Sequence, residues 1–261
     1  MRCSGRHRAG RTRGAEPGMS WFYRPLATRS AELRLFCFPY AGAGPNIFRG
    51  WPRLLPGSIE ACGVVLPGRA FRLDERPRDR LGPLADELVS VFRGLPAAPF
   101  AFFGHSFGGL LCFEIARRLH RLGAPLPRRL FVSACPPPHL PPAEPDVHRL
   151  PDRALKERLQ QLGGTPLPVL ECPELIDLFM PVLRADLKAF ETHDHEPGPP
   201  LPVPMTILAG AGDRLARAEV LEEWGRYTRE SFDVRVFPGG HFFLHSDEEA
   251  VVATVADALG P

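Results

Sequence analysis

The chain has 261 residues, which is enough for one large domain with a well-buried core. A composition that is 44% hydrophobic and 24% charged is ordinary for a globular protein and too apolar for a disordered one. The formal net charge is +2, and residues 1–18 hold five arginines against Glu16, which leaves −2 for the remainder. That balance excludes a basic body able to follow a nucleic-acid backbone.

We interpret residues 1–20 as a disordered basic leader and residues 21–261 as a single domain. The leader lacks the apolar segment of a signal peptide, and no run of about 18 apolar residues predicts a membrane span. The six cysteines are scattered without a Cys-x-x-Cys pair, which is typical of reduced thiols in a cytoplasmic protein and predicts no metal site.

Short apolar runs alternate along the chain with longer amphipathic ones, a pattern typical of βαβ units. Strands are predicted at residues 33–38, 61–66, 100–103, 129–134, 205–209 and 234–237. Helices are predicted at residues 81–95, 107–122, 152–162, 173–190, 217–230 and 247–259. The pattern therefore predicts an α/β fold with a mainly parallel sheet flanked by helices.

The alternation stops between Cys135 and Pro204, where two or three helices and proline-rich joints replace the strands. A helical excursion between two strands predicts a lid inserted at about residues 136–203. The alternative is a long crossover whose helices pack on the sheet. The lid is favoured because the segment lies, in chain order, between the candidate nucleophile and the candidate acid described below.

The sequence GHSFG at residues 104–108 matches the G-x-S-x-G pattern of a nucleophile elbow. It follows an apolar run and precedes an amphipathic one, so it lies in the strand–turn–helix context that the elbow requires. The pattern predicts Ser106 as a nucleophile on a strained turn, with a helix N-terminus directed at developing negative charge. The alternative is a glycine-rich turn with a serine in solvent.

A serine nucleophile needs a general base, and the base needs a carboxylate that orients it. In this context the chain order is serine, then acid, then histidine. His241 fits the base because it follows the last predicted strand through Pro-Gly-Gly and precedes the final helix. Asp213 fits the acid because it ends a glycine-rich loop directly after the strand at residues 205–209. A turn-forming aspartate is the alternative there.

The other candidates are less well placed. His105 is next to the nucleophile but faces away from it in an elbow. An i, i+4 pair of His241 and His245 could bind a metal, but no third ligand is evident. Four further candidates lie in the predicted insertion, where no strand positions them: His193, His195, Asp186 and Asp194.

An oxyanion hole requires the backbone N–H after the nucleophile, here that of Phe107, and another from the loop after an early strand. That loop has the sequence FPYAGAG at residues 38–44. We predict Ala41 as the second donor, with its neighbour Tyr40 as the alternative. A flexible glycine turn would explain the same composition.

Taken in order, these segments resemble the type II thioesterases, the stand-alone α/β-hydrolases that accompany polyketide synthases and nonribosomal peptide synthetases. The resemblance runs from about Leu33 to Leu259. Five segments carry it: FPYAGA at 38–43, LPGR at 66–69 with RLDE at 72–75, GHSFGG at 104–109, LFMPVLRAD at 178–186 and GGHFF at 239–243.

The resemblance implies the α/β-hydrolase fold and an enzyme of antibiotic biosynthesis that removes aberrant acyl groups from a synthase. The substrate would be an acyl thioester on the phosphopantetheine arm of a carrier-protein domain, so no separate cofactor is expected. Tyr40 and Arg69 are placed near the approach of that arm or carrier, with a structural turn and a surface arginine as the equal alternative. Arg214 departs from the family, which often has an acidic residue there, and alters the charge around Asp213.

Two rival functions remain open. A carboxylesterase, lipase or acyltransferase would use the same three residues, because a triad serves esters and thioesters alike. A non-catalytic protein that binds carrier domains would retain the fold, although an intact triad argues against it.

Overall fold

The computed structural model describes residues 21–26, 31–165 and 167–260, so the predicted leader at residues 1–20 lies outside the described part. The described residues form one seven-stranded sheet in the order β1-β3-β2-β4-β5-β6-β7. Only the β1–β3 pair is antiparallel, which confirms the mainly parallel sheet. The strands are β1 (Phe22–Tyr23), β2 (Leu33–Phe38), β3 (Ile59–Val64), β4 (Phe100–His105), β5 (Leu130–Ser133), β6 (Met205–Gly210) and β7 (Phe232–Phe237).

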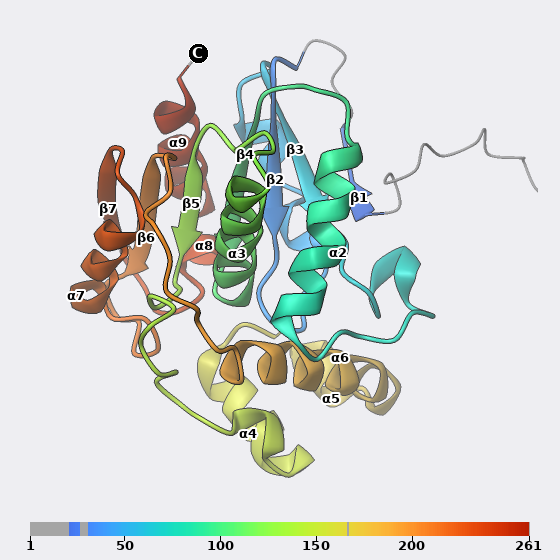
Figure 1. The fold of residues 1–261 in the computed structure, drawn as a ribbon. Coiled ribbons are helices and arrows are strands. Elements are labelled where there is room, and N and C mark those ends of the chain that lie inside the picture. Colours follow the sequence, from blue (N-terminus) through green and yellow to red (C-terminus); the bar gives the residue numbers. More distant parts are fainter. Residues whose placement is uncertain (1–20, 27–30, 166, 261) are drawn as a thin grey trace, which may run out of the picture.

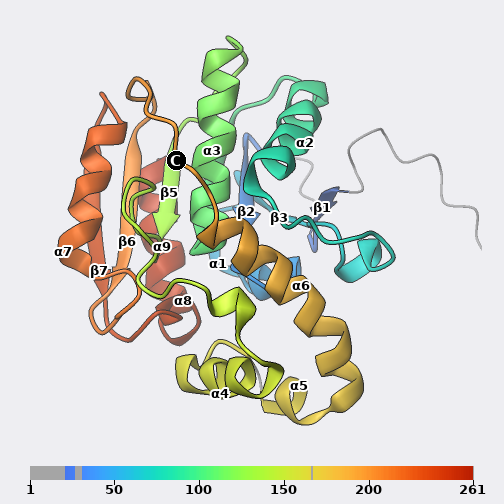
Figure 2. The same ribbon diagram turned by 60° about the horizontal axis from the view of Figure 1, so that its bottom comes forward.

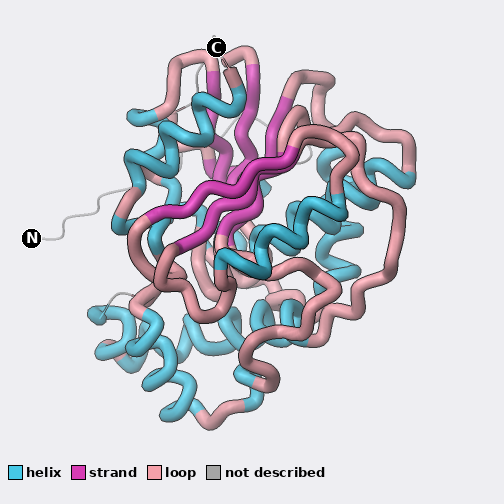
Figure 3. The backbone as a smooth tube through the Cα atoms, turned by 90° about the vertical axis from the view of Figure 1, so that its left-hand side faces the viewer, coloured by secondary structure: helices cyan, strands magenta, loops and turns pink. Residues whose placement is uncertain are grey.

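Helices cover both faces of this sheet, as Figures 1 and 3 show. Helices α2, α3 and α7 pack on one face, and α1, α8 and α9 pack on the other. Three more helices, α4 to α6, lie beyond one end of the strands. Their bounds are α1 (Trp51–Leu54), α2 (Leu81–Gly94), α3 (Phe107–Arg121), α4 (Asp152–Leu162), α5 (Leu167–Glu171), α6 (Pro173–Glu191), α7 (Ala218–Leu221), α8 (Phe243–Ser246) and α9 (Glu248–Leu259).

The two helical layers explain why residues 35–38 of β2 form a continuous apolar run. In β2, Phe36 and Phe38 enter the core shared with α2 and α3. The alternate residues Leu35 and Cys37 enter the core shared with α9. A parallel strand buried on both faces has no polar side, so its sequence shows no alternation.

The prediction of a single helix at residues 217–230 is wrong. Residues 217–230 form the short α7 and then a 3-10 helix at Glu222–Tyr227 instead of one α-helix. The three-residue repeat of a 3-10 helix places Trp224 and Tyr227 on the same side, and both rings contact Phe113, at centroid distances of 4.9 and 5.1 Å. The two-residue β1 and the short α1, α5 and α8 were not predicted either.

Residues 136–203 run from the end of β5 to the start of β6, and we refer to them as the insert. They contain α4, α5 and α6 and, as predicted, no strand within the described residues. Figure 2 shows these helices grouped at the end of the sheet where the parallel strands terminate. No helix in the described part of the chain is long and apolar enough to cross a membrane.

Packing of α3 against the sheet generates the first testable prediction. A Cβ atom at Gly108 would lie 2.2 Å from the carbonyl oxygen of Phe38, and this backbone has no freedom to withdraw. We expect Gly108→Ala to reduce the free energy of unfolding by about 3 kcal/mol through overpacking. Gly94, exposed at the end of α2, has nothing within 4 Å of such a Cβ.

Urea unfolding of both variants measures the difference. Gly94→Ala should match the wild type or exceed its stability by up to about 1 kcal/mol, because alanine is the better helix former. Equal stability of the two variants would contradict the close approach of α3 to β2.

Candidate active site

Ser106 occupies a sharp turn between β4 and α3. Its backbone angles are φ +53° and ψ −118°, which a residue with a side chain adopts only when the surroundings impose them. The Ser106 N–H donates to the Ser133 carbonyl on β5 at 2.7 Å, and the Ser106 carbonyl accepts from Gly109 N–H at 2.8 Å. The strand–turn–helix predicted from the GHSFG sequence is therefore present.

Asp213 and His241 lie together on the loops that follow β6 and β7. The carboxylate oxygen Oδ2 of Asp213 lies 2.8 Å from His241 Nδ1. Its other oxygen, Oδ1, accepts from the N–H groups of Leu215 and Ala216 at 2.8 and 3.1 Å. Because an ionised carboxylate only accepts, Nδ1 is the protonated nitrogen in the neutral ring, which leaves Nε2 with a free lone pair.

The surroundings of Asp213 keep this carboxyl ionised. Burial raises its pKa, but the hydrogen bond from His241, the charge interaction with that ring and the two backbone N–H donors outweigh burial. The pKa of Asp213 therefore lies below its ordinary value. The group remains an acceptor for His241 throughout the neutral range.

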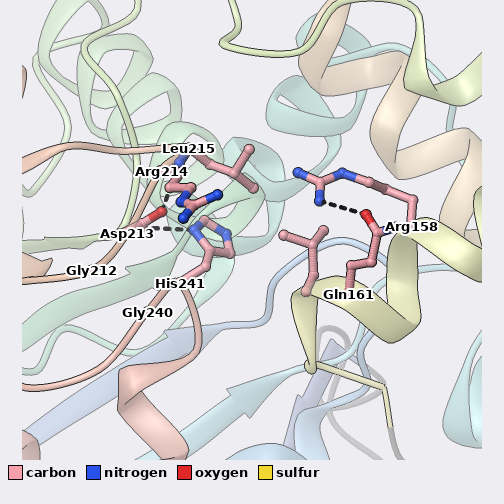
Figure 4. A pocket seen from close by; sticks show the side chains of 9 residues that line it. Arg158, Gln161, Gly212, Asp213, Arg214, Leu215, Gly240 and His241 are labelled. Carbon is pink, nitrogen blue, oxygen red and sulfur yellow. Dashed lines mark hydrogen bonds and ion pairs between the residues drawn. The ribbon is translucent and has the colours of Figure 1, made fainter.

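Two adjoining cavities meet at His241. The inner cavity, of about 100 Å³, is mainly apolar and is lined by Ser106 and His241 together with the insert residues Leu187 and Phe190. The outer cavity, of about 420 Å³, contains Asp213, Arg214 and His241, facing Arg158 and Gln161 of α4 (Figure 4). Four residues line both cavities: Arg158, Leu162, Leu215 and His241.

Both predicted oxyanion donors border the inner cavity. Ala41 and Phe107 line it with Ser106. Within the described residues, neither their N–H groups nor that of Tyr40 has a hydrogen-bond acceptor. Tyr40 is distinguished by its side chain, whose hydroxyl lies 3.0 Å from His245 Nε2 and donates to Gly164 O at 3.1 Å. Burial raises the pKa of Tyr40 to about 12. The cavity lining thus favours Ala41 over Tyr40 as the loop donor.

Arg69 is not the surface residue that the approach of a carrier would require. It is only 6% exposed, and both terminal nitrogens donate to the carboxylate of Asp186, at 2.7 and 2.8 Å. Nη1 also donates to the carbonyl of Ala43 at 3.0 Å. Arg69 is buried because its guanidinium pairs with Asp186 of α6, a partner 117 residues away in the sequence.

The other candidates have separate partners. His105 is buried with Nδ1 2.9 Å from Ser133 Oγ, and His245 is bound to Tyr40 rather than paired with His241. Asp194 is exposed. Among the described residues, Glu114, His193 and His195 form a group with metal-ligand spacing, but Arg117 and Arg118 already hold the Glu114 carboxylate. Two guanidinium groups disfavour a cation there.

The sequence pattern missed one ion pair in the inner cavity. Arg158 of α4 donates through Nε to Glu144 Oε2 at 2.7 Å and through Nη2 to Oε1. Both side chains line the inner cavity. The two residues are 14 positions apart and Glu144 lies in an irregular segment before α4, so no periodicity indicates their pairing.

Comparison with known proteins identifies the family of this site. The family model described as "Thioesterase domain" matches residues 33–259. The chain belongs to the thioesterase family. It is similar to the gramicidin S biosynthesis protein GrsT of Aneurinibacillus migulanus, with 36% identity over 92% of this chain and 93% of the relative.

Solved structures extend the comparison. The thioesterase RedJ from the prodiginine pathway of Streptomyces coelicolor is 40% identical, with a TM-score of 0.84 and 96% of each chain covered. The type II thioesterase BorB from the borrelidin biosynthetic cluster is 32% identical, with a TM-score of 0.85, covering 92% of this chain and 98% of BorB. The predicted resemblance to type II thioesterases and the α/β-hydrolase fold are confirmed.

The buried His105 ring generates a pH prediction for this thioesterase. Burial, with the charges of His241 and His245, holds the pKa of His105 well below its ordinary 6.5. The unfolded chain therefore gains a proton below pH 6.5 that the folded chain does not, so stability falls as the pH falls. From pH 8 to pH 5 this one ring should remove about 2 kcal/mol of unfolding free energy.

Urea unfolding at pH 8 and pH 5 tests this value in the wild type and in His105→Gln. The variant should lose about 2 kcal/mol less than the wild type over that interval. The same loss in both proteins would show that His105 gains its proton in the folded state.

Proposed function

We propose that this thioesterase hydrolyses acyl thioesters on the phosphopantetheine arm of carrier-protein domains, using Ser106, His241 and Asp213 as its catalytic triad. The observation that carries the proposal is the 2.8 Å contact between Asp213 and His241 beside a cavity that Ser106 also lines. A nucleophile, a base and an orienting acid on one sheet edge are what acyl transfer through an acyl-enzyme requires.

In the first half of the proposed reaction, Ser106 Oγ attacks the thioester carbonyl carbon and His241 Nε2 takes the serine proton. The negative charge formed on the carbonyl oxygen faces the free N–H groups of Ala41 and Phe107. The tetrahedral intermediate collapses, the carbon–sulfur bond breaks, and the thiolate leaves with the proton from His241. The acyl group remains on Ser106.

In the second half, water replaces the thiol. His241 takes a proton from water as the oxygen attacks the acyl-enzyme, and it returns that proton to Ser106 Oγ when the ester bond breaks. Asp213 holds the imidazole in one tautomer and stabilises the imidazolium in both halves. The carboxylic acid product and free enzyme result.

The two cavities support a thioester with a long arm as the substrate. The apolar inner cavity suits the acyl group, and the larger outer cavity leads from His241 toward solvent. Arg214 is exposed in the outer cavity, where its charge suits the phosphodiester of the arm. Relatives such as GrsT and RedJ belong, by their names, to biosynthetic pathways, which supports a synthase carrier domain as the partner.

The insert would act as a lid in this reaction. Its side chains Leu162, Leu187 and Phe190 form part of the wall of the inner cavity, opposite loops from the sheet. A wall of this kind excludes bulk water from the acyl-enzyme and contacts the acyl chain. We therefore assign acyl-group preference to the insert.

The main test presents one acyl group in three forms: on a carrier protein, on free pantetheine and as an oxygen ester. Carrier-bound turnover should be fastest, the free thioester slower and the oxygen ester slowest. Ser106→Ala should lower hydrolysis of all three by more than 10³-fold, because removal of a triad nucleophile leaves only the oxyanion hole and binding.

The rival functions give different results in that assay. A preference for the oxygen ester would indicate a carboxylesterase with the same triad. No turnover of any form, with no labelling of Ser106 by a fluorophosphonate, would indicate a carrier-binding protein without catalysis. Unchanged activity in Ser106→Ala would overturn the mechanism.

A second test concerns the acid. Asp213→Asn should lower kcat on the carrier-bound thioester by about 10³–10⁴-fold with little change in KM, because an amide at this position allows the wrong histidine tautomer. Asp194→Asn is the matched control, since this aspartate is exposed on the insert. Its kcat should stay within twofold of the wild type. Equal effects of the two substitutions would contradict the role of Asp213.

A further inference from the structure

We propose that Asp186, on helix α6 of the insert, is a positioning residue for the oxyanion hole. We infer that direct contacts with the insert hold the loop at residues 39–44, here called the oxyanion loop, in its conformation. The inference rests on the proposed function, because it takes the Ala41 N–H as a donor to the developing oxyanion.

Asp186 binds the oxyanion loop directly. Its Oδ2 accepts from the Gly42 N–H at 2.8 Å, one residue after Ala41. Arg69 holds the same carboxylate through both terminal nitrogens and also donates to the carbonyl of Ala43. Asp186 is 1% exposed, so the whole arrangement is shielded from water. The peptide groups on the C-terminal side of Ala41 are therefore fixed by a charged group that belongs to α6.

A second contact from the insert holds the other side of Ala41. The Tyr40 hydroxyl donates to Gly164 O in the segment between α4 and α5, at 3.1 Å. Phe179 of α6 lies under Gly42, where a Cβ atom would come within 2.7 Å of its ring. Gly42 has φ +78°, so the loop needs glycine there for its conformation and for this contact. The insert thus contacts the oxyanion loop on both sides of the predicted donor.

These contacts affect catalysis because an oxyanion hole requires a narrow range of donor positions. A donor stabilises the transition state only when it lies about 2.7–3.1 Å from the position that the oxyanion will occupy. Ala41 has no hydrogen-bond acceptor of its own among the described residues, so its direction depends on its neighbours Tyr40 and Gly42. Helix α6 cannot lift away without depriving the Arg69 guanidinium of its carboxylate partner and the Gly42 N–H of its acceptor.

The alternative is that the Arg69–Asp186 pair stabilises only the fold. A structural role lowers the thermal midpoint without changing the chemistry of the folded enzyme. A positioning role lowers kcat with little change in KM and weakens the binding of a transition-state analogue by the same factor. The two roles are therefore separable in variants that remain folded.

The experiment uses an aryl acetate ester, whose hydrolysis needs the serine and the oxyanion hole but no carrier protein. A trifluoromethyl ketone, which forms a tetrahedral oxyanion on Ser106, serves as the transition-state analogue. Asp186→Asn should lower kcat by about 10–100-fold, less than the 10²–10³-fold cost of deleting a donor. The inhibition constant of the ketone should rise by the same factor, with KM within twofold of the wild type.

The matched control is Asp152→Asn. Asp152 also lies in the insert and also pairs with an arginine, Arg184 of α6. It is exposed, however, and among the described residues its side chain makes no hydrogen bond to the oxyanion loop. It should leave kcat and the inhibition constant within twofold. If Asp186→Asn does not fold, Tyr40→Phe decides. It removes the hydroxyl contact to Gly164 of the insert, together with that to His245, and should lower kcat and ketone affinity by about 3–10-fold in parallel.

Unchanged kcat and ketone affinity in folded Asp186→Asn, or a fall in kcat without a matching loss of ketone affinity, would overturn the inference. With Asp186→Asn unfolded, wild-type values in Tyr40→Phe would do the same. Failure of the proposed function is distinguishable. Wild-type enzyme that cleaves the ester but no carrier thioester would refute the substrate, and ester cleavage by Ser106→Ala would refute the triad.

Discussion

The close packing of α3 on the sheet determines the geometry of everything else at the site. A Cβ atom at Gly104 or Gly108 would lie 2.2 Å from backbone oxygen, so the chain must pass from β4 into α3 without side chains at either position. Ser106 lies between them in a strained conformation with φ +53° and ψ −118°, which costs of order 1–3 kcal/mol. The buried apolar face of α3 offsets that cost and keeps Ser106 at the carboxyl end of β4. Parallel strands then bring the loops after β6 and β7 to the same edge.

Two buried carboxylates organise this edge in similar ways. Asp213 receives two backbone N–H groups and a histidine, and Asp186 receives one backbone N–H group and both ends of a guanidinium. In each case the charge is fully hydrogen-bonded, which is the condition under which burial of an ion is tolerated. Each carboxylate also fixes the backbone of a loop as well as a side chain. Asp213 thereby holds its own loop against His241, and Asp186 holds a loop from the opposite half of the chain.

The sequence predicted the parts of the site that depend on local pattern and chain order. Ser106, Asp213 and His241 each follow a strand of the parallel part of the sheet, and parallel topology alone brings such positions together. The Arg69–Asp186 pair could not be predicted in this way, because its members are 117 residues apart and lie on a turn and an inserted helix. The helix predicted at residues 217–230 was wrong for a related reason. Contacts of Trp224 and Tyr227 with Phe113 on α3 favour a 3-10 helix that local propensity does not indicate.

The position of Asp186 bears on how acyl preference can vary on this fold. If the insert shapes the acyl cavity, substitutions within it change the substrate without touching Ser106 or His241. Helix α6 is the exception. Its Leu187 and Phe190 line the cavity, and its Asp186 binds the oxyanion loop through the Gly42 N–H. A shift of α6 that enlarges the cavity would also move a peptide group beside Ala41. Changes in specificity are therefore better accommodated by α4 and the segment around Glu144. Their side chains line the cavity but, apart from Gly164 beside α4, these segments hold no part of the oxyanion loop.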